Sequence, residues 1–290
     1  MVVISLRIGG LILNYFKMDW IQGDKFIGLA DFTFSPGDRH LDDYDKLPNT
    51  LDLSNLKPVN IVYTHTIYAK QLLELIASVQ REFIIITHNS DVNIDESFRM
   101  PKNVLKWYSQ NVNVVDPRIE SIPIGLENNR WFQSEMKKEK MENRVLHPRI
   151  YKNTVYMNHN ASTNPEKREF LYSLFGGESW VTSERGKNGR GFTEYLEDIY
   201  DHNFVICPEG NGMDTHRTWE TLYMRSIPIE KRNINNQFYT DLPICFVDDW
   251  SEITLAFLGS EYKRIKNGVW NMKKLTFEYW RNKILRYGQE

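Results

Sequence analysis

The sequence predicts an α/β fold with two doubly wound domains that face each other across a cleft. Apolar runs with strand character alternate with segments of helical periodicity in both halves of the chain. A charged run, followed by a proline a few residues later, separates the halves, and 290 residues suffice for two ordinary domains. Strands that alternate with helices indicate parallel sheets covered on both faces. We therefore expect one domain over residues 1–147 and a second over residues 148–290.

The composition excludes several classes of protein. Apolar residues make up 41% of the chain and charged residues 26%, which favours a packed core over disorder. The net charge of -2 argues against a nucleic-acid partner. Cys207 and Cys245 lie in apolar, strand-like runs, so we expect reduced cysteines in the core.

The N-terminal apolar stretch, residues 2–15, predicts a first strand or hairpin. Arg7, Gly9 and Gly10 interrupt it, and it is too short to span a bilayer. It also lacks the basic start and the small-residue cleavage site of a signal peptide. We expect a soluble, cytoplasmic protein without a membrane span.

In the first half, the apolar runs predict strands and one helix. The segment 67–81 has helical periodicity, and the charged run 136–144 is predicted to be a solvated helix leading into a linker. The predicted strands are residues 26–30, 60–65, 83–87, 103–108 and 120–124.

The second half repeats this alternation. Pro165 suits the first turn of a helix over residues 165–175, and Asn164 is a natural N-cap for it. Further helices are predicted over residues 192–200, from about Thr215, and within the aromatic-rich tail 251–286. The predicted strands are residues 153–157, a short one at Val181, 204–207, 227–229 and 243–247.

The segment 203–229 has the residue types that hold a nucleotide diphosphate. Gly210 and Gly212 allow close backbone approach after a buried strand, and Asp214 or Thr215 can cap the next helix. The start of a helix offers free N–H groups and positive potential to an anion.

Two side chains on that helix extend this chemistry. Arg217 and Glu220 are three residues apart and share a helical face, so an arginine for diphosphate and a carboxylate for ribose hydroxyls lie together. The alternative is an ordinary salt-bridged pair at the start of a helix.

This segment, PEGNGMDTHRTWETLYMRSIPI, resembles the nucleotide-sugar-binding signature of exostosin-like glycosyltransferases. In that family a strand leads into P-x-G, a short loop, an arginine, a glutamate, a small residue and an I-P-[VI] strand. Arg225 departs from the pattern, which more often has a small or apolar residue there. The matching residues here are Pro208, Gly210, Arg217, Glu220, Ser226, Ile227, Pro228 and Ile229.

Weaker similarities to the same group extend over residues 60–250, in FIIITHNSD, KWYSQNVNV, IPIGLENNRW and YMNHNASTNPEKR. Compact soluble members of the group are encoded by large DNA viruses of algae and by some bacteria. A viral member would act in the host cytoplasm.

The resemblance implies a GT-B glycosyltransferase with two Rossmann-like domains and a C-terminal helix that crosses back to the first domain. It implies transfer of a sugar, with xylose as a specific expectation, from a UDP-sugar to a glycan or glycoprotein acceptor. Transfer would invert the anomeric carbon, without a metal or other cofactor.

The resemblance also assigns the nucleotide-sugar contacts. Arg168 would neutralise the leaving diphosphate; the alternative is that the nearby asparagines only close a turn. Ser183, Arg185 and the loop 186–191 would border the base; the alternative there is a plain surface loop. The expected contacts are Asn158, Asn160, Thr163, Arg168, Ser183, Pro208, Glu209, Gly210, Asn211, Gly212, Asp214, Thr215, His216, Arg217 and Glu220.

Inverting transfer needs a base for the acceptor hydroxyl, which we expect from the facing domain. His88 and Asp91 follow a buried strand, His65 ends the preceding strand, and Asp31 follows the run 26–30. The alternative is that His88 and Asp91 cap a turn. Gln110, Asn111 and residues 127–130 are expected to shape the acceptor side or the boundary between the domains.

Three alternatives remain open. GDP-fucose could replace the UDP-sugar, because fucosyltransferases of this architecture also have a glutamate-bearing helix here. The chain could bind a nucleotide or sugar without turnover. Asp43 and Asp45 form a D-x-D pattern that holds Mn²⁺ or Mg²⁺ in other transferases, although it lies in a turn-rich stretch far from the nucleotide signature.

Overall fold

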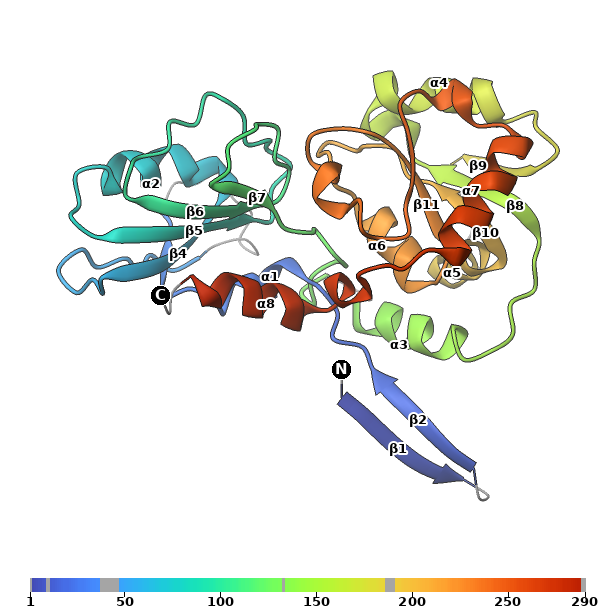
Figure 1. The fold of residues 1–290 in the computed structure, drawn as a ribbon, viewed down its shortest axis with the longest axis horizontal. Helices are drawn as coiled ribbons and strands as arrows, with labels where there is room; N and C mark the ends of the chain where they lie inside the picture. The colour runs from blue at the N-terminus through green and yellow to red at the C-terminus, as the bar shows by residue number, and fades with distance from the viewer. Residues whose placement is uncertain (1, 9–10, 37–46, 132–133, 186–190, 288–290) are drawn as a thin grey trace.

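The computed structural model describes residues 2–8, 11–36, 47–131, 134–185 and 191–287. Two lobes, each built around a parallel sheet of five strands, lie side by side (Figure 1). An antiparallel hairpin of β1 (Val2–Ile8) and β2 (Leu11–Lys17) extends away from both lobes. The hairpin predicted at the N-terminus is therefore confirmed, as is an α/β fold with parallel sheets.

The first sheet follows the order of the chain. Its strands are arranged β3-β4-β5-β6-β7, so this order has no reversal among the described strands, unlike that of a doubly wound sheet. The strands are β3 (Phe32–Phe34), β4 (Val59–His65), β5 (Glu82–His88), β6 (Val104–Ser109) and β7 (Ile119–Ser121).

The strand predicted over residues 26–30 is wrong. Helix α1 (Gly23–Ile27) occupies this region, and β3 begins after Asp31. Phe26 is fully buried, and Ile27, Leu29 and Ala30 pack partly buried against the same core, so the end of a short helix and the turn after it produced the apolar run. Short apolar runs do not distinguish a strand from a buried helix by periodicity alone.

The two faces of the first sheet are covered by different parts of the chain. Val62, Ile85 and Trp107 pack toward α2 (Ala69–Ile76), which follows the 3₁₀ turn Thr66–Tyr68. The opposite face packs against α1 and against α8 (Phe277–Arg286), which comes from the C-terminal tail. The last helix therefore crosses back to the first lobe (Figure 1).

The second sheet has the order β12-β11-β10-β8-β9. The strand order reverses between β8 and β10, and in open parallel sheets such a reversal opens a crevice beyond the carboxyl ends of the strands. The strands are β8 (Asn153–His159), β9 (Val181–Arg185), β10 (His202–Ile206), β11 (Ile227–Lys231) and β12 (Cys245–Val247).

Helices cover both faces of the second sheet. Helices α4 (Pro165–Phe175) and α7 (Leu255–Asn267) pack on one face, and α5 (Phe192–Asp201) and α6 (His216–Tyr223) on the other. The 3₁₀ turns of this half are Ala161–Thr163, Asn236–Tyr239, Trp250–Glu252 and Met272–Leu275.

The helix predicted over residues 136–144 forms as α3 (Ser134–Arg144), but the prediction that it is solvated is wrong. Its residues Ser134, Lys137, Lys138 and Met141 are buried. It packs against α5 of the second lobe. Charge density alone cannot reveal this, because a lysine can bury its methylene stem and still find a partner for its ammonium group.

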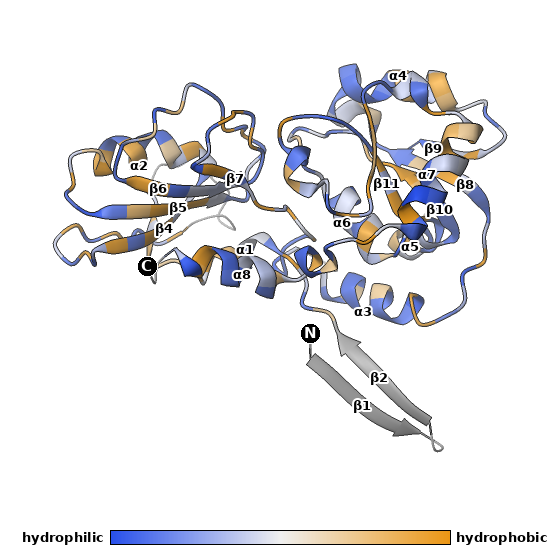
Figure 2. Cartoon of the chain, viewed as in Figure 1, coloured by the Kyte–Doolittle hydropathy of each residue, from blue (hydrophilic) through white to orange (hydrophobic). Residues whose placement is uncertain are grey.

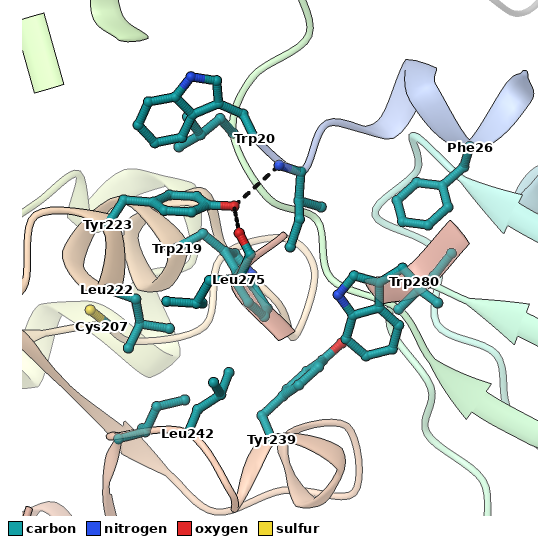
Figure 3. Close-up of a cluster of buried hydrophobic side chains, with 14 of the residues drawn as sticks. Trp20, Phe26, Cys207, Trp219, Leu222, Tyr223, Tyr239, Leu242, Leu275 and Trp280 are labelled. Carbon is teal, nitrogen blue, oxygen red and sulfur yellow. Dashed lines mark hydrogen bonds between the residues drawn. The ribbon is translucent and has the colours of Figure 1, made fainter. Parts of the chain in front are cut away.

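The two lobes share one hydrophobic core. Trp219 and Leu222 of the second lobe belong to the same cluster as Phe26 and Trp280 beside the first sheet (Figure 3). The hydroxyl of Tyr223 accepts a hydrogen bond from the Ile21 amide and donates one to the Leu275 carbonyl, both at 3.1 Å. Apolar residues concentrate on the strands and on inward helix faces (Figure 2). We call the buried boundary between the two lobes the seam.

Both cysteines, Cys207 and Cys245, are buried and unpaired, as predicted. No helix within the described ranges is long and apolar enough to cross a membrane.

Candidate functional site

Two arginines lie where the strand order of the second sheet reverses. Arg168 is on α4, which follows β8, and Arg217 is on α6, which follows β10. Because β8 and β10 are parallel neighbours, the elements after their carboxyl ends meet at one edge of the sheet. Among the described residues, neither arginine forms an ion pair with a carboxylate. We call this pair the arginine cluster.

Arg168 is held by backbone carbonyls. Its Nε donates to the Glu209 carbonyl at 2.7 Å, Nη1 to that of Asn160 at 3.0 Å and Nη2 to that of Pro208 at 3.4 Å. Burial lowers the pKa of Arg168, and the charge of Arg217 lowers it further. A guanidinium has five N–H groups, so this clamp leaves two for a ligand.

The guanidinium of Arg217 lacks a complete set of partners. Its Cζ lies 5.2 Å from the centroid of the Tyr195 ring. Its Nη1 is buried and, within the described chain, has no hydrogen-bond partner. Leaving a buried cationic donor unpaired is unfavourable, so an anion at this position would complete its coordination.

Glu220 is buried beside this cluster, and its carboxylate is already engaged. Oε2 accepts a hydrogen bond from the Tyr195 hydroxyl at 2.7 Å, and Oε1 pairs with Lys137 of α3. Burial alone would raise the pKa of Glu220, but the charge and hydrogen bond of Lys137 and the Tyr195 bond outweigh it and lower the pKa to about 2. The carboxylate is therefore ionised, and its partner is Lys137 rather than Arg217.

A polar group closes the carboxyl ends of β8 and β9. Nδ2 of Asn158 donates to the Tyr156 hydroxyl at 2.7 Å and to Glu184 Oε2 at 3.3 Å, and the Tyr156 hydroxyl donates to the same oxygen at 3.0 Å. Ser183 is half-buried in the middle of β9, opposite Met157 and on the other face of the sheet, where a Cβ on Gly176 at the end of α4 would lie 3.8 Å from its Oγ. The structure thus brings Asn158, but not Ser183, to the edge that carries the arginine cluster.

Asn160 and Thr163 have local roles. Oδ1 of Asn160 accepts a hydrogen bond from the Ser162 amide at 3.1 Å and caps the 3₁₀ turn that Thr163 ends. Arg185 forms an exposed ion pair with Glu169. The glycine-rich loop predicted at the base lies mostly in residues 186–190, outside the described residues.

The loop after β10 is held from both sides. The Gly210 amide donates to the Gly212 carbonyl at 3.0 Å, and the Gly210 carbonyl accepts from Asn164 Nδ2 at 2.8 Å. Asn164 therefore fastens this loop and makes no side-chain cap bond to α4, although it occupies the N-cap position. Lys167 pairs with the Glu209 carboxylate, and Asn211 is exposed.

The same loop also forms the seam. A Cβ on Gly212 would lie 2.6 Å from Nδ2 of Asn111, so any larger residue here would displace the Asn111 side chain. The Asp214 amide donates to Asn111 Oδ1 at 2.9 Å, and Asp214 Oδ2 accepts from the Ile124 amide at 2.7 Å. Burial raises the pKa of Asp214 to about 7. Asp214 therefore joins the lobes, and Thr215, at the N-cap position of α6, makes no cap bond.

A cavity of about 270 Å³ lies on the seam, which we call the seam cavity. It is bounded by residues that follow β5, β6 and β7 of the first sheet and by the first residue of α6. Nδ1 of His216 and the Gly125 carbonyl are hydrogen-bonded at 2.7 Å at its wall. Among its lining residues are Asp91, Gln110, Asn128, Arg130, Trp131 and His216.

Of the residues predicted as the base, His88 is buried at this cavity. Its Nδ1 accepts from the Asn89 amide at 2.7 Å, its Nε2 lies 3.0 Å from the Pro123 carbonyl, and its ring stacks on Phe26. Burial lowers the pKa of His88 to about 4. Both ring nitrogens are thus engaged by the backbone.

The other three predicted bases lie in different places. Asp91 is exposed and lines the seam cavity. His65 is buried at the end of β4, with its ring edge-on to Tyr63 at 6.1 Å. Asp31 accepts from the Ile61 amide at 3.0 Å and pairs with Lys57 at 2.5 Å. Because Asp31 precedes β3, it lies at the opposite edge of the sheet from His65 and His88.

Asp43 and Asp45 lie outside the described residues. Within the described part of the chain, no group of three or more His, Cys, Asp or Glu residues is placed to hold a metal ion.

Sequence reasoning missed the residues that surround Glu220. Lys137 lies in a charged run, and Tyr195 lies in a helix without a motif. Their contact with Glu220 joins α3, α5 and α6, so no local signal could reveal it. In the sequence, Lys137 and Met141 are four residues apart and therefore share one face of the predicted helix 136–144, but nothing marks that face as buried.

Comparison with known proteins adds no assignment. No model of a known protein family matches the chain, and no curated protein matches it either.

Proposed function

We propose that the chain is a glycosyltransferase that moves a sugar from a nucleotide sugar to a glycan or glycoprotein acceptor. The observation that carries the proposal is the arginine cluster. Arg168 and Arg217 stand at the strand-order reversal of a parallel sheet, and within the described residues no carboxylate pairs with either of them. A leaving diphosphate has the charge and geometry to satisfy both guanidiniums.

The surroundings support a nucleotide rather than a free phosphate. Burial lowers the pKa of His159 to about 4, and the positive charges of Arg217 and Arg168 also lower it. The two guanidiniums therefore create a positive potential of the kind that an anion site needs. The polar group of Asn158 and Glu184, at the same edge of the sheet, would offer hydrogen bonds to the ribose or the base, whereas both oxygens of Glu220 are already engaged by Lys137 and Tyr195. UDP is the expected nucleotide and xylose the expected sugar, on the resemblance of residues 203–229 to exostosin-like enzymes.

Displacement at the anomeric carbon would transfer the sugar with inversion. Arg168 and Arg217 would take the negative charge that develops on the leaving diphosphate, without a metal in the step. GDP-fucose is the competing nucleotide sugar.

A thermal-shift series with UDP, GDP, UDP-xylose and GDP-fucose tests the proposal. A ligand at about 100 times its Kd stabilises the folded state by about 2.7 kcal/mol, so the correct nucleotide should raise the Tm clearly. Arg217→Ala should remove this shift. Arg281→Ala, at an exposed position of α8, should leave it unchanged.

Turnover is measured separately, as release of free nucleotide and as the mass gain of an acceptor glycan. A Tm shift without transfer to any acceptor would reduce the protein to a nucleotide-binding module. No shift with any nucleotide would contradict the proposal. Full activity in EDTA is expected, and its loss would point to Asp43 and Asp45.

A further inference from the structure

The seam cavity is a second site, separate from the arginine cluster. Its volume of about 270 Å³ is near the lower end of ligand pockets, roughly 300–1,000 Å³. It lies between the carboxyl ends of three strands of the first sheet and the first turn of α6. Consecutive residues of a helix leave it about 100° apart. His216 therefore lines this cavity, while Arg217 stacks on Tyr195 of α5.

The lining of the cavity suits a hydroxyl-rich molecule. Gln110 is 1% exposed, and its Oε1 is buried with no hydrogen-bond partner among the described residues. A carbonyl oxygen in that state accepts a donor such as an alcohol O–H. Trp131 is 52% exposed and borders the same cavity, where its ring face can pack against the C–H face of a sugar.

His216 has a free lone pair at this cavity. The Gly125 carbonyl can only accept, so Nδ1 of His216 carries the proton of their 2.7 Å bond. In the neutral ring Nε2 is then the basic nitrogen. Within the described residues, no hydrogen bond is formed by Nε2. Backbone anchoring of one ring nitrogen, with the other facing a cavity, is the arrangement that a general base requires.

The other candidate bases are less suitable. His88 uses both ring nitrogens on the backbone, and Asp31 lies at the far edge of the sheet. Asp91 is exposed to solvent, so water competes for its carboxylate. His216 is partly buried, lines the cavity and stands one residue before Arg217 of the arginine cluster.

We infer that the seam cavity binds the acceptor saccharide and that His216 is the catalytic base, an inference that rests on the proposed function. The acceptor hydroxyl gives its proton to Nε2 of His216 while its oxygen forms a bond to the anomeric carbon. The bond from that carbon to the phosphate oxygen breaks, and its electron pair stays on the diphosphate at the arginine cluster. Water then removes the proton from His216.

The decisive variant is His216→Asn. The asparagine Nδ2 can replace Nδ1 of histidine as donor to Gly125, so the seam is kept while the base is lost. We expect kcat for transfer to fall about 10²- to 10⁴-fold. The Tm shift caused by the nucleotide should stay unchanged. His147→Asn, at an exposed histidine, is the matched control and should retain full activity.

The pH profile gives a readout that a structural role would not move. A general base works only in its unprotonated form, so kcat/KM of the wild type should fall at acid pH, and this acid limb should be absent from the residual activity of His216→Asn. The charged and titratable groups around His216 are Asp24 of α1, His88 at the end of β5, Asp91 after it, Arg130 after β7, and Asp214 and Glu220 around α6.

The acceptor site is tested with Trp131→Ala, which should raise the acceptor KM about tenfold and leave nucleotide binding unchanged. An unchanged KM would overturn the acceptor site. A larger loss of kcat in Asp91→Asn than in His216→Asn would overturn His216 as the base while leaving the transferase intact. A wild-type protein that binds nucleotide and transfers no sugar would overturn the proposed function and this inference with it.

Discussion

The two sheets of this protein bury their faces in different ways. The second sheet is covered on one face by α4 and α7 and on the other by α5 and α6, which all come from its own half of the chain. The first sheet receives α2 on one face, but the other face depends on α1 and on α8 from the C-terminal tail. The difference follows from strand order.

Right-handed crossovers between strands that advance in one direction all fall on one face of the sheet. The first sheet has such an order, so its other face has to be covered from elsewhere. The second sheet reverses its order between β8 and β10, and this places crossover helices on both faces. The first half is thus incomplete without the tail, and a fragment of residues 1–147 should not fold alone.

The largest expected effect is at the tail helix. Trp280 is fully buried in the shared core, and Trp280→Ala should cost about 4 kcal/mol of unfolding free energy. Hydrogen exchange should rise more in β4, β5 and β6 than in β8 and β10. Val269→Ala, at a side chain that is 100% exposed, should change stability by less than about 0.5 kcal/mol. Equal loosening of both sheets would refute this dependence on the tail.

The next effect is at the buried ion pair between α3 and the second lobe. The side chains of Lys137 and Glu220 are 6% and 4% exposed, and Lys137→Met should cost about 3 kcal/mol because it leaves a buried carboxylate without its cation. Adding Glu220→Gln should recover part of the loss. Lys231→Met, in an exposed pair with Asp249, should cost less than about 1 kcal/mol.

The sign of the pH dependence adds a second check on this pair. The folded pKa of Glu220 is depressed to about 2, below its ordinary value of 4.5. Its contribution is therefore present above pH 4.5 and is lost as the pH falls toward 2. The difference between wild type and Lys137→Met, measured by urea unfolding, should shrink over that range. A constant difference would contradict the role of the carboxylate charge.

The smallest effect is at the close approach across the seam. Gly212→Ala should cost about 2 kcal/mol, because the new Cβ would lie 2.6 Å from the Asn111 side chain. Adding Asn111→Gly should restore part of this stability, since Asn111 has a φ of 58°. Gly259→Ala, on α7 with nothing within 4 Å, should instead gain about 0.5–1 kcal/mol. Similar losses in both glycine variants would refute the seam contact.

Local patterns predicted most elements and part of the candidate site. The helix over residues 165–175 has the predicted bounds, and the strands around Val62 and Ile85 lie where apolar runs placed them. The loop with Gly210 and the helix with Arg217 could also be predicted, because the signals for a strand, a glycine loop and a helix follow one another in the chain.

The proposed base, His216, could not be predicted in this way. The sequence favoured a base from the first half, yet the seam brings His216 of the second half to the same cavity as His88 and Asp91. Which ring nitrogen keeps its lone pair depends on the backbone group that it meets, and Gly125 is distant in the sequence.

The sequence by itself determined the alternation of strands and helices and the placement of Arg168 and Arg217 after two of the strands, because periodicity and turn residues act over a few positions. Only the tertiary structure decided that α8 covers the first sheet, that Lys137 reaches Glu220 and that one core joins the lobes. These contacts join distant residues, such as Ile21 and Tyr223, which are 202 positions apart. Such contacts depend on which surfaces pack together in the folded chain, and no pattern of neighbouring residues in the sequence encodes that.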